Sequence, residues 1–155
     1  MHKPWLHSVS WESVMNLNKA LCQAQKVEPT TDARKLEKAR QLWEGAQDKP
    51  LSLKDALDLC RQCHELNGFV FNNGNTFAAA SRTLLEDHLA ALPPVEAQII
   101  RTTVSHYVVG LIGRRELLEV IRHYEPVWKS ATRPAAAPKA APVAAPMLSQ
   151  PQPQV

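Results

Sequence analysis

The sequence lacks the features that mark several large classes of protein. It has no run of roughly 18 apolar residues, the length that a membrane-spanning helix needs. No apolar stretch follows the first basic residue, so the N-terminal segment does not resemble a secretory signal. The three cysteines are too few, and odd in number, for a disulfide framework. These absences predict a cytoplasmic protein with reduced thiols and no membrane partner.

Signatures of catalysis are also missing. The sequence contains no phosphate-binding loop, dinucleotide fingerprint, nucleophile elbow or H-E-x-x-H motif. Ser105 and His106 are adjacent, and neighbouring residues on a helix point in different directions, so they do not form a nucleophile and base. The sequence therefore predicts a protein that is not an enzyme and that needs no cofactor.

What the sequence does contain is typical of one compact domain. Of its 155 residues, 45% are hydrophobic and 21% are charged. Aromatic residues make up only 6%, so aliphatic side chains and alanine must fill most of the core. The net charge of +3 is far below that of a dedicated nucleic-acid-binding protein.

Apolar residues recur at helical spacing through the first 129 residues, and no strand alternation competes with this pattern. Ser10, Thr31, Ser52 and Thr76 are predicted N-caps. The fold class that follows is all-α, a compact bundle of about six helices. Their predicted ranges are 11–26, 32–47, 52–68, 77–92, 95–111 and 114–124. The fifth helix is the most hydrophobic and is predicted to be central, and Pro126 is predicted to end the last.

The composition changes near residue 130. Half of the 12 prolines lie in residues 130–155, among many alanines. Proline blocks helix formation and alanine offers little area to bury, so this segment is predicted to be a disordered tail after a helical domain of residues 1–129. Met147 and Leu148 are the only apolar anchors in the tail, and they are candidates for binding a partner.

One short motif suggests chemistry. Cys60, Cys63 and His64 form C-x-x-C-H, the pattern by which a c-type haem is attached: two thiols form thioethers and the imidazole ligates iron. The same residues with Cys22 could supply a Cys3His zinc set. However, successive helical residues such as Cys63 and His64 point about 100° apart, which strains a shared metal. Haem or metal binding at Cys60, Cys63 and His64 is therefore an alternative function and not the favoured one.

Packing explains both cysteines more simply. Cys60 and Cys63 continue the apolar stripe that begins at Leu53 on the third predicted helix, so both sulfurs should face the core. Free cysteine behaves as a small hydrophobic residue. We expect the two thiols to be inert packing groups.

The C-terminal third is basic, which raises a second alternative. Arg114 and Arg115 would begin the last helix after a glycine turn, an arrangement that suits phosphate contacts in a nucleic-acid-binding protein. Glu116 and Glu119 on the same helix would repel phosphate, so nucleic acid is possible but not favoured.

By elimination, the sequence predicts an adaptor or subunit that binds another protein. Trp5 and Trp128 lie near the two ends of the helical domain, where a tryptophan either tucks onto the bundle or anchors a partner. Tucking is the favoured outcome, because an indole is large and apolar. The candidate partner-binding residues are Trp5, Trp128, Arg114, Arg115, Met147 and Leu148.

Overall fold

A computed structural model of the chain describes residues 1–131, with side chains to Lys129. It confirms the all-α class. Within these residues there are seven α-helices, one 3-10 helix and two very short strands. The predicted disordered tail, with Met147 and Leu148, lies outside the described residues apart from its first two positions.

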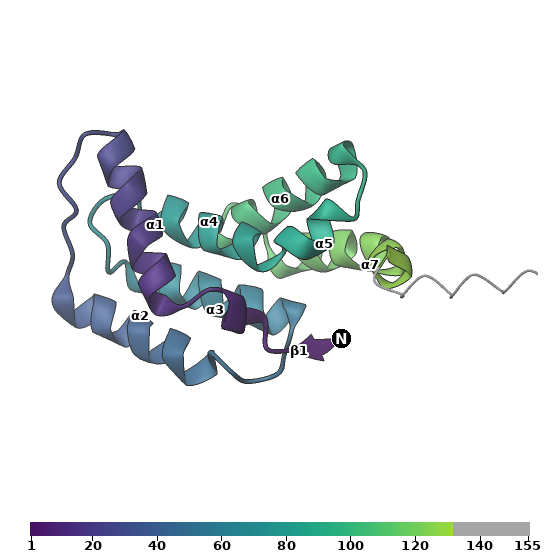
Figure 1. The fold of residues 1–155 in the computed structure, drawn as a ribbon, viewed down its shortest axis with the longest axis horizontal. Coiled ribbons are helices and arrows are strands. Elements are labelled where there is room, and N and C mark those ends of the chain that lie inside the picture. The colour runs from purple at the N-terminus through teal and green to yellow at the C-terminus, as the bar shows by residue number, and fades with distance from the viewer. Residues whose placement is uncertain (132–155) are drawn as a thin grey trace, which may run out of the picture.

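The helices form a bundle with α3 and α4 in the middle. Helices α1 and α2 lie at one end, and α5, α6 and α7 lie at the other (Figure 1). An antiparallel pair of strands, β1 and β2, joins the N-terminal segment to the start of α3. The bounds of the elements are β1 (His2–Lys3), η1 (Trp5–Ser8), α1 (Trp11–Ala24), α2 (Ala33–Ala46), β2 (Leu51–Ser52), α3 (Leu53–Leu66), α4 (Asn73–Leu84), α5 (Glu86–Ala90), α6 (Pro94–Val108) and α7 (Arg114–Ala131).

Side-chain caps fix the start of three helices. Ser10 and Ser52 each accept a hydrogen bond at 3.1 Å from the backbone N–H three residues later, as predicted for N-caps. The cap of α2 is Asp32, which accepts from Lys35 N at 3.1 Å, rather than Thr31. A carboxylate at this position also interacts favourably with the positive end of the helix dipole.

The central helix is α4, not the fifth predicted helix. Helix α4 contacts α1, α3 and α6. Its buried residues are mostly small or polar: Asn73, Thr76, Phe77, Ala78, Ala80, Ser81 and Leu84. Small residues let the three neighbouring helices approach α4 closely. The prediction that α6 would be central considered hydrophobicity alone. On α6, Val95 and Ile99 are exposed, so only one side of this apolar helix is covered.

The core is organised around an aromatic cluster. Phe77 of α4 lies 5.9 Å from Phe69 and 6.5 Å from both Trp11 and Trp43, measured between ring centroids. The Trp43 indole N–H donates to the Val9 carbonyl at 2.8 Å, which fixes the segment before α1 against α2.

Two predicted helices differ from the structure. The segment predicted as one helix over 77–92 is divided into α4 and α5, because a tight turn at Leu85 lets both Leu85 and Leu89 be buried. The last helix was predicted to end at 124, but α7 continues through Pro126 to Ala131. Burial of Trp128 and the Glu125–Lys129 ion pair, at 2.8 Å, favour these further residues, about two helical turns, despite the proline.

Within residues 1–131, the helices are too short or too polar to cross a bilayer.

Candidate functional site

The structure places the two cysteines of the C-x-x-C-H motif in the core. Helix α3 carries Cys60 and Cys63 on its inner face, and neither residue has any exposed surface, as predicted. The Cys63 thiol donates to the Ala39 carbonyl at 3.7 Å. Burial raises the pKa of Cys63 to about 12. Burial and the neighbouring Cys63 raise the pKa of Cys60 further above its usual range. Because thiolates are the reactive form, both groups are suited to packing rather than to ligation.

His64 faces a different neighbour from the two cysteines. The Asn73 side-chain amide donates to His64 Nδ1 at 3.1 Å and to the His64 carbonyl at 2.8 Å. Since the amide donates, Nδ1 accepts and the ring proton lies on Nε2. Burial lowers the pKa of His64, as does Arg61 to a smaller extent. The imidazole thus joins α3 to the start of α4.

The fourth member of the possible zinc set lies apart. Cys22 of α1 is buried, and its thiol donates to Asn18 Oδ1 at 3.7 Å. Among residues 1–131, no three His, Cys, Asp or Glu side chains converge in a way that could hold a metal ion. The structure therefore does not bring Cys22, Cys60, Cys63 and His64 together.

We expect the three thiols to resist modification in the native protein. Cys22, Cys60 and Cys63 are all fully buried, so reaction with Ellman's reagent should be slow in native buffer and should reach three equivalents in guanidinium chloride. Val70→Cys, at an exposed position, is the positive control and should react at once. Rapid reaction of a native thiol would contradict the packing role.

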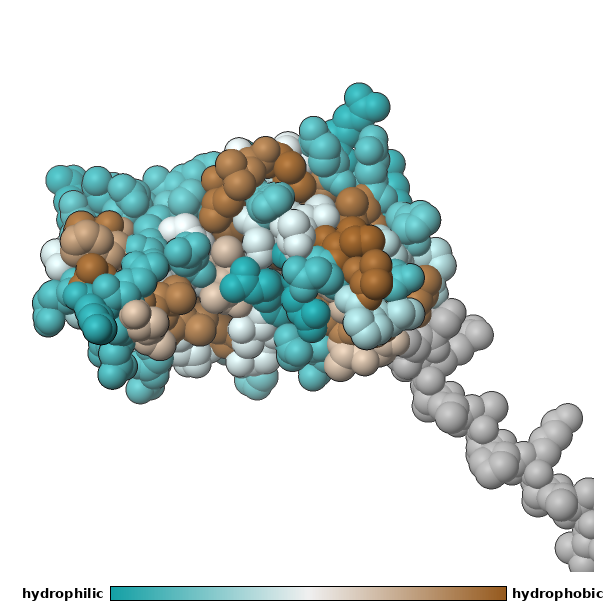
Figure 2. Space-filling model, turned by 90° about the horizontal axis from the view of Figure 1, so that it is seen from above, coloured by the Kyte–Doolittle hydropathy of each residue, from teal (hydrophilic) through white to brown (hydrophobic). Residues whose placement is uncertain are grey.

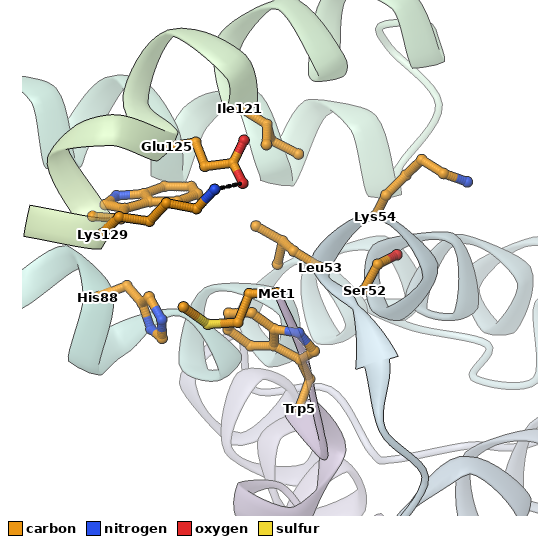
Figure 3. A pocket seen from close by; sticks show the side chains of 10 residues that line it. Met1, Trp5, Ser52, Leu53, Lys54, His88, Ile121, Glu125 and Lys129 are labelled. Carbon is orange, nitrogen blue, oxygen red and sulfur yellow. Dashed lines mark ion pairs between the residues drawn. The ribbon is translucent and has the colours of Figure 1, made fainter. Parts of the chain in front are cut away.

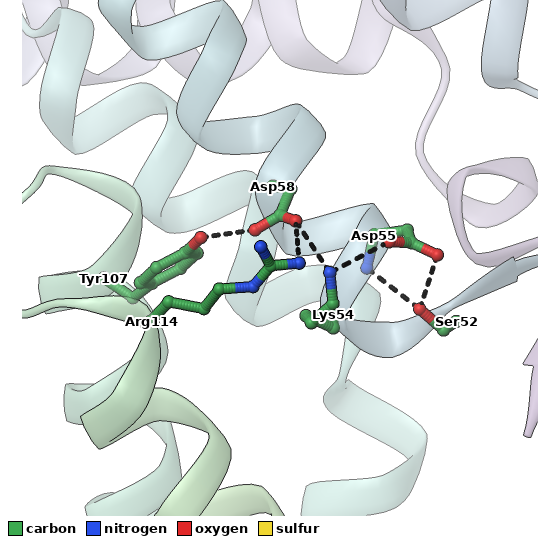
Figure 4. A network of polar contacts seen from close by, with 6 residues as sticks. All are labelled: Ser52, Lys54, Asp55, Asp58, Tyr107 and Arg114. Atoms are coloured by element: carbon green, nitrogen blue, oxygen red, sulfur yellow. Dashed lines mark hydrogen bonds and ion pairs between the residues drawn. The ribbon is translucent and has the colours of Figure 1, made fainter.

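Arg114, one of the candidate partner-binding residues, belongs to a polar cluster between α3, α6 and α7 (Figure 4). Asp58 of α3 lies at its centre. Asp58 accepts a hydrogen bond from the Tyr107 hydroxyl and forms ion pairs with Lys54 at 3.2 Å and Arg114 at 3.5 Å. Burial, then the hydrogen bond to Asp58, raises the pKa of Tyr107 to about 12, so the phenol stays a donor.

Arg114 and Arg115, the two arginines considered for phosphate contacts, each have a carboxylate neighbour. Arg114 faces Asp58, and Arg115 pairs with Glu119 at 3.1 Å. These pairs are partly or fully exposed, so they add little to stability. They do place a carboxylate beside each guanidinium, which weakens the positive field that a phosphate would meet.

Trp5 and Trp128 are both tucked in, with 4% and 6% of their surface exposed. The structure brings them together, although they come from opposite ends of the domain, and His88 lies against both indole rings. They line a pocket at the junction of η1, β2, α3, α5 and α7 (Figure 3). The remaining lining residues are Met1, Ser52, Leu53, Lys54, Ile121, Glu125 and Lys129.

His88 is the residue of this pocket that sequence reasoning missed. It is 7% exposed, and its pKa is lowered by burial and then by Lys3, so the imidazole is neutral at pH 7. The only signal in the sequence was a histidine placed among leucines, which is also typical of a core residue. The sequence also gave no signal that Trp5 and Trp128 line the same pocket, because they lie in distant segments that meet only in the folded chain.

A third surface lies on the outer side of α6. Val95 and Ile99 are 70% and 42% exposed. With Pro94, Gln98, Thr102 and Thr103 they line a shallow groove along this helix. Helix α6 runs along the upper edge of the fold in Figure 1, and Figure 2, which looks from above, shows brown apolar patches set in a mainly hydrophilic surface. None of the six groove residues carries a charge.

Comparisons with protein-family models, with curated proteins and with solved structures find no match to this chain.

Proposed function

We propose that this protein is a non-enzymatic binding module, an adaptor or a subunit, that holds another protein through the outer face of α6. The observation that supports this proposal is the distribution of apolar residues on α6. Its inner side buries Ala97, Ile100 and Val104, while Val95 and Ile99 continue the apolar surface to the opposite side. A helix that is apolar around most of its circumference is usually covered on all sides. A partner would supply the missing cover.

The chemistry of the groove defines the partner. Its six lining residues are uncharged, so an apolar and uncharged stripe is the complementary surface. From Val95 to Thr103 the groove spans about 12 Å at 1.5 Å per residue, or about two helical turns. It therefore fits an amphipathic helix that presents apolar side chains at positions i and i+4.

The two alternatives have less support. Arg114 and Arg115 each lie beside a carboxylate, which is unfavourable for nucleic acid. Cys60 and Cys63 are enclosed in the core, and His64 Nδ1 is hydrogen-bonded to Asn73, which is unfavourable for haem.

Site-specific photo-crosslinking of the full-length chain tests the proposal. A benzophenone amino acid at position 95 should crosslink one protein in the native host. The crosslinked residue of that protein should lie on the apolar face of a helix. The same probe at the exposed position Val70 is the matched control and should not capture that protein. Identical products from both positions, or a product that is a second copy of this chain, would contradict the proposal.

A substitution gives the energetic test. Val95→Asp should weaken binding of the captured partner by about tenfold or more, because it places a charge in an apolar contact. Val95 lies in the first turn of α6, where an acidic residue is compatible with the helix dipole, so the fold should be retained. Val70→Asp is the matched variant and should leave the affinity unchanged. Calorimetry of the purified pair measures both.

A further inference from the structure

The pocket between Trp5 and Trp128 has the size and lining of a small-molecule site. Its cavity is about 150 Å³, which accommodates one benzene-sized ring. The indole rings of Trp5 and Trp128, with Leu53 and Ile121, supply apolar walls from three separate segments of the chain, η1, α3 and α7. Such a concave, mostly apolar cavity with a few polar groups is the usual form of a ligand site.

Two buried polar groups in this lining have no hydrogen-bond partner among the described residues. They are Nε1 of Trp5 and Nδ1 of His88. Both side chains are more than nine-tenths buried, and their ring centroids are 4.9 Å apart. The contrast with Trp43 is clear, because its buried indole N–H donates to a backbone carbonyl. A buried polar atom without a partner is uncommon. The Trp5 indole N–H can only donate, so the missing partner of Trp5 is an acceptor.

Met1 lines the same pocket as these two groups. In Figure 3 it lies between His88 and Trp5 on the inside of the pocket. A thioether is a weak acceptor and cannot replace a carbonyl or carboxylate oxygen. Met1 is 58% exposed, and a flexible unbranched side chain of this kind is easily moved. A ligand could therefore take its place beside Trp5.

The charges around the pocket select the sign of the ligand. Lys54 and Lys129 line it, and both are in ion pairs, Lys54 with Asp55 and Asp58 and Lys129 with Glu125. Lys3 adds a further positive charge, with Nζ 3.9 Å from the centre of the Trp5 ring. Aromatic walls also suit organic cations, but Lys3 already occupies one face of Trp5 and repels a second cation there.

We propose that this pocket binds a small carboxylic acid with one aryl-sized apolar group. The apolar group occupies the cavity between the two indole rings in place of the Met1 side chain. The carboxylate accepts a hydrogen bond from Trp5 Nε1, on the ring that Lys3 Nζ also contacts. This binding does not depend on the proposed partner surface of α6.

Binding to the full-length chain can be tested with three probes of similar size. Phenylacetate is the anion, phenylacetamide is neutral and phenethylamine is the cation. Phenylacetate should bind saturably, at least about fivefold more tightly than the amide, with the amine weakest. In ¹H–¹⁵N spectra the Trp5 indole N–H resonance should move downfield on titration, while that of Trp43 should stay, because Trp43 already donates to Val9.

A variant separates the polar contact from the apolar one. Trp5→Phe keeps an aromatic wall and removes the indole N–H, so it should abolish the preference for phenylacetate over phenylacetamide. Trp11→Phe is the matched control, because Trp11 belongs to the core cluster and not to the pocket. It should keep the preference. Circular dichroism identifies a temperature at which both variants are folded.

Several results would overturn the assignment. They are equal affinity for the anion and the amide, tighter binding of the amine, a Trp5 resonance that does not move, or no saturable binding of phenylacetate in the millimolar range. Each concerns the unmodified protein, so the proposal can fail even if Trp5→Phe does not fold. Partner capture at Val95 is a separate measurement, and its outcome leaves this one unaffected.

Discussion

Replacing Phe77 with alanine should lower the free energy of unfolding by about 4 kcal/mol. Phe77 has no exposed surface, and its ring contacts Trp11, Trp43 and Phe69. Truncation removes apolar area and leaves a cavity that three large rigid rings cannot easily fill. Urea denaturation followed by circular dichroism at 222 nm measures the change.

Phe71→Ala is the matched control. Phe71 is 43% exposed, whereas Phe77 is fully buried. The same substitution should therefore cost less than about 1 kcal/mol. Similar losses for Phe71→Ala and Phe77→Ala would show that the aromatic cluster is not the centre of the core.

Replacing Gly68 with alanine should cost about 3 kcal/mol. A Cβ atom at this position would lie 2.8 Å from Leu36 Cα and 2.9 Å from Leu36 N, both in the backbone of α2. Helix backbone cannot move aside as a flexible side chain can. The Gly68 carbonyl also accepts from Asp32 N at 2.8 Å, so a shift would disturb the cap of α2. Thermal and urea denaturation measure the loss.

Gly45→Ala tests whether this cost is steric. Gly45 lies within α2, and a Cβ atom there would meet nothing within 4 Å. Alanine is the better helix former, so this variant should gain about 0.5–1 kcal/mol. If both glycine variants change stability in the same direction, the close approach of residue 68 to α2 is not what requires glycine.

Local signals in the sequence predicted the helices and part of the core. Ser10 and Ser52 cap helices because their side chains satisfy backbone N–H groups a few residues away, a local interaction that sequence reveals. The stripe through Cys60 and Cys63 predicted their burial for the same reason, since helical periodicity fixes which residues share a face.

The prediction of the central helix failed because hydrophobicity is only one reason for burial. Helix α4 is central through alanine, serine, threonine and asparagine, whose small size allows close packing. Helix α6 is more apolar but is covered on one side only, and its exposed residues support the proposed partner surface. Pro126 similarly failed to end α7, because tertiary burial of Trp128 outweighs the local penalty of a proline.

By itself, the sequence determined the helical class, most helix positions and the inward orientation of the two motif cysteines. All of these depend on spacing within a few residues. Only the tertiary structure decided which helix is central, which face of α6 is uncovered and that Trp5, His88 and Trp128 line one pocket. These features depend on contacts between segments tens of residues apart, which no local pattern of polarity specifies.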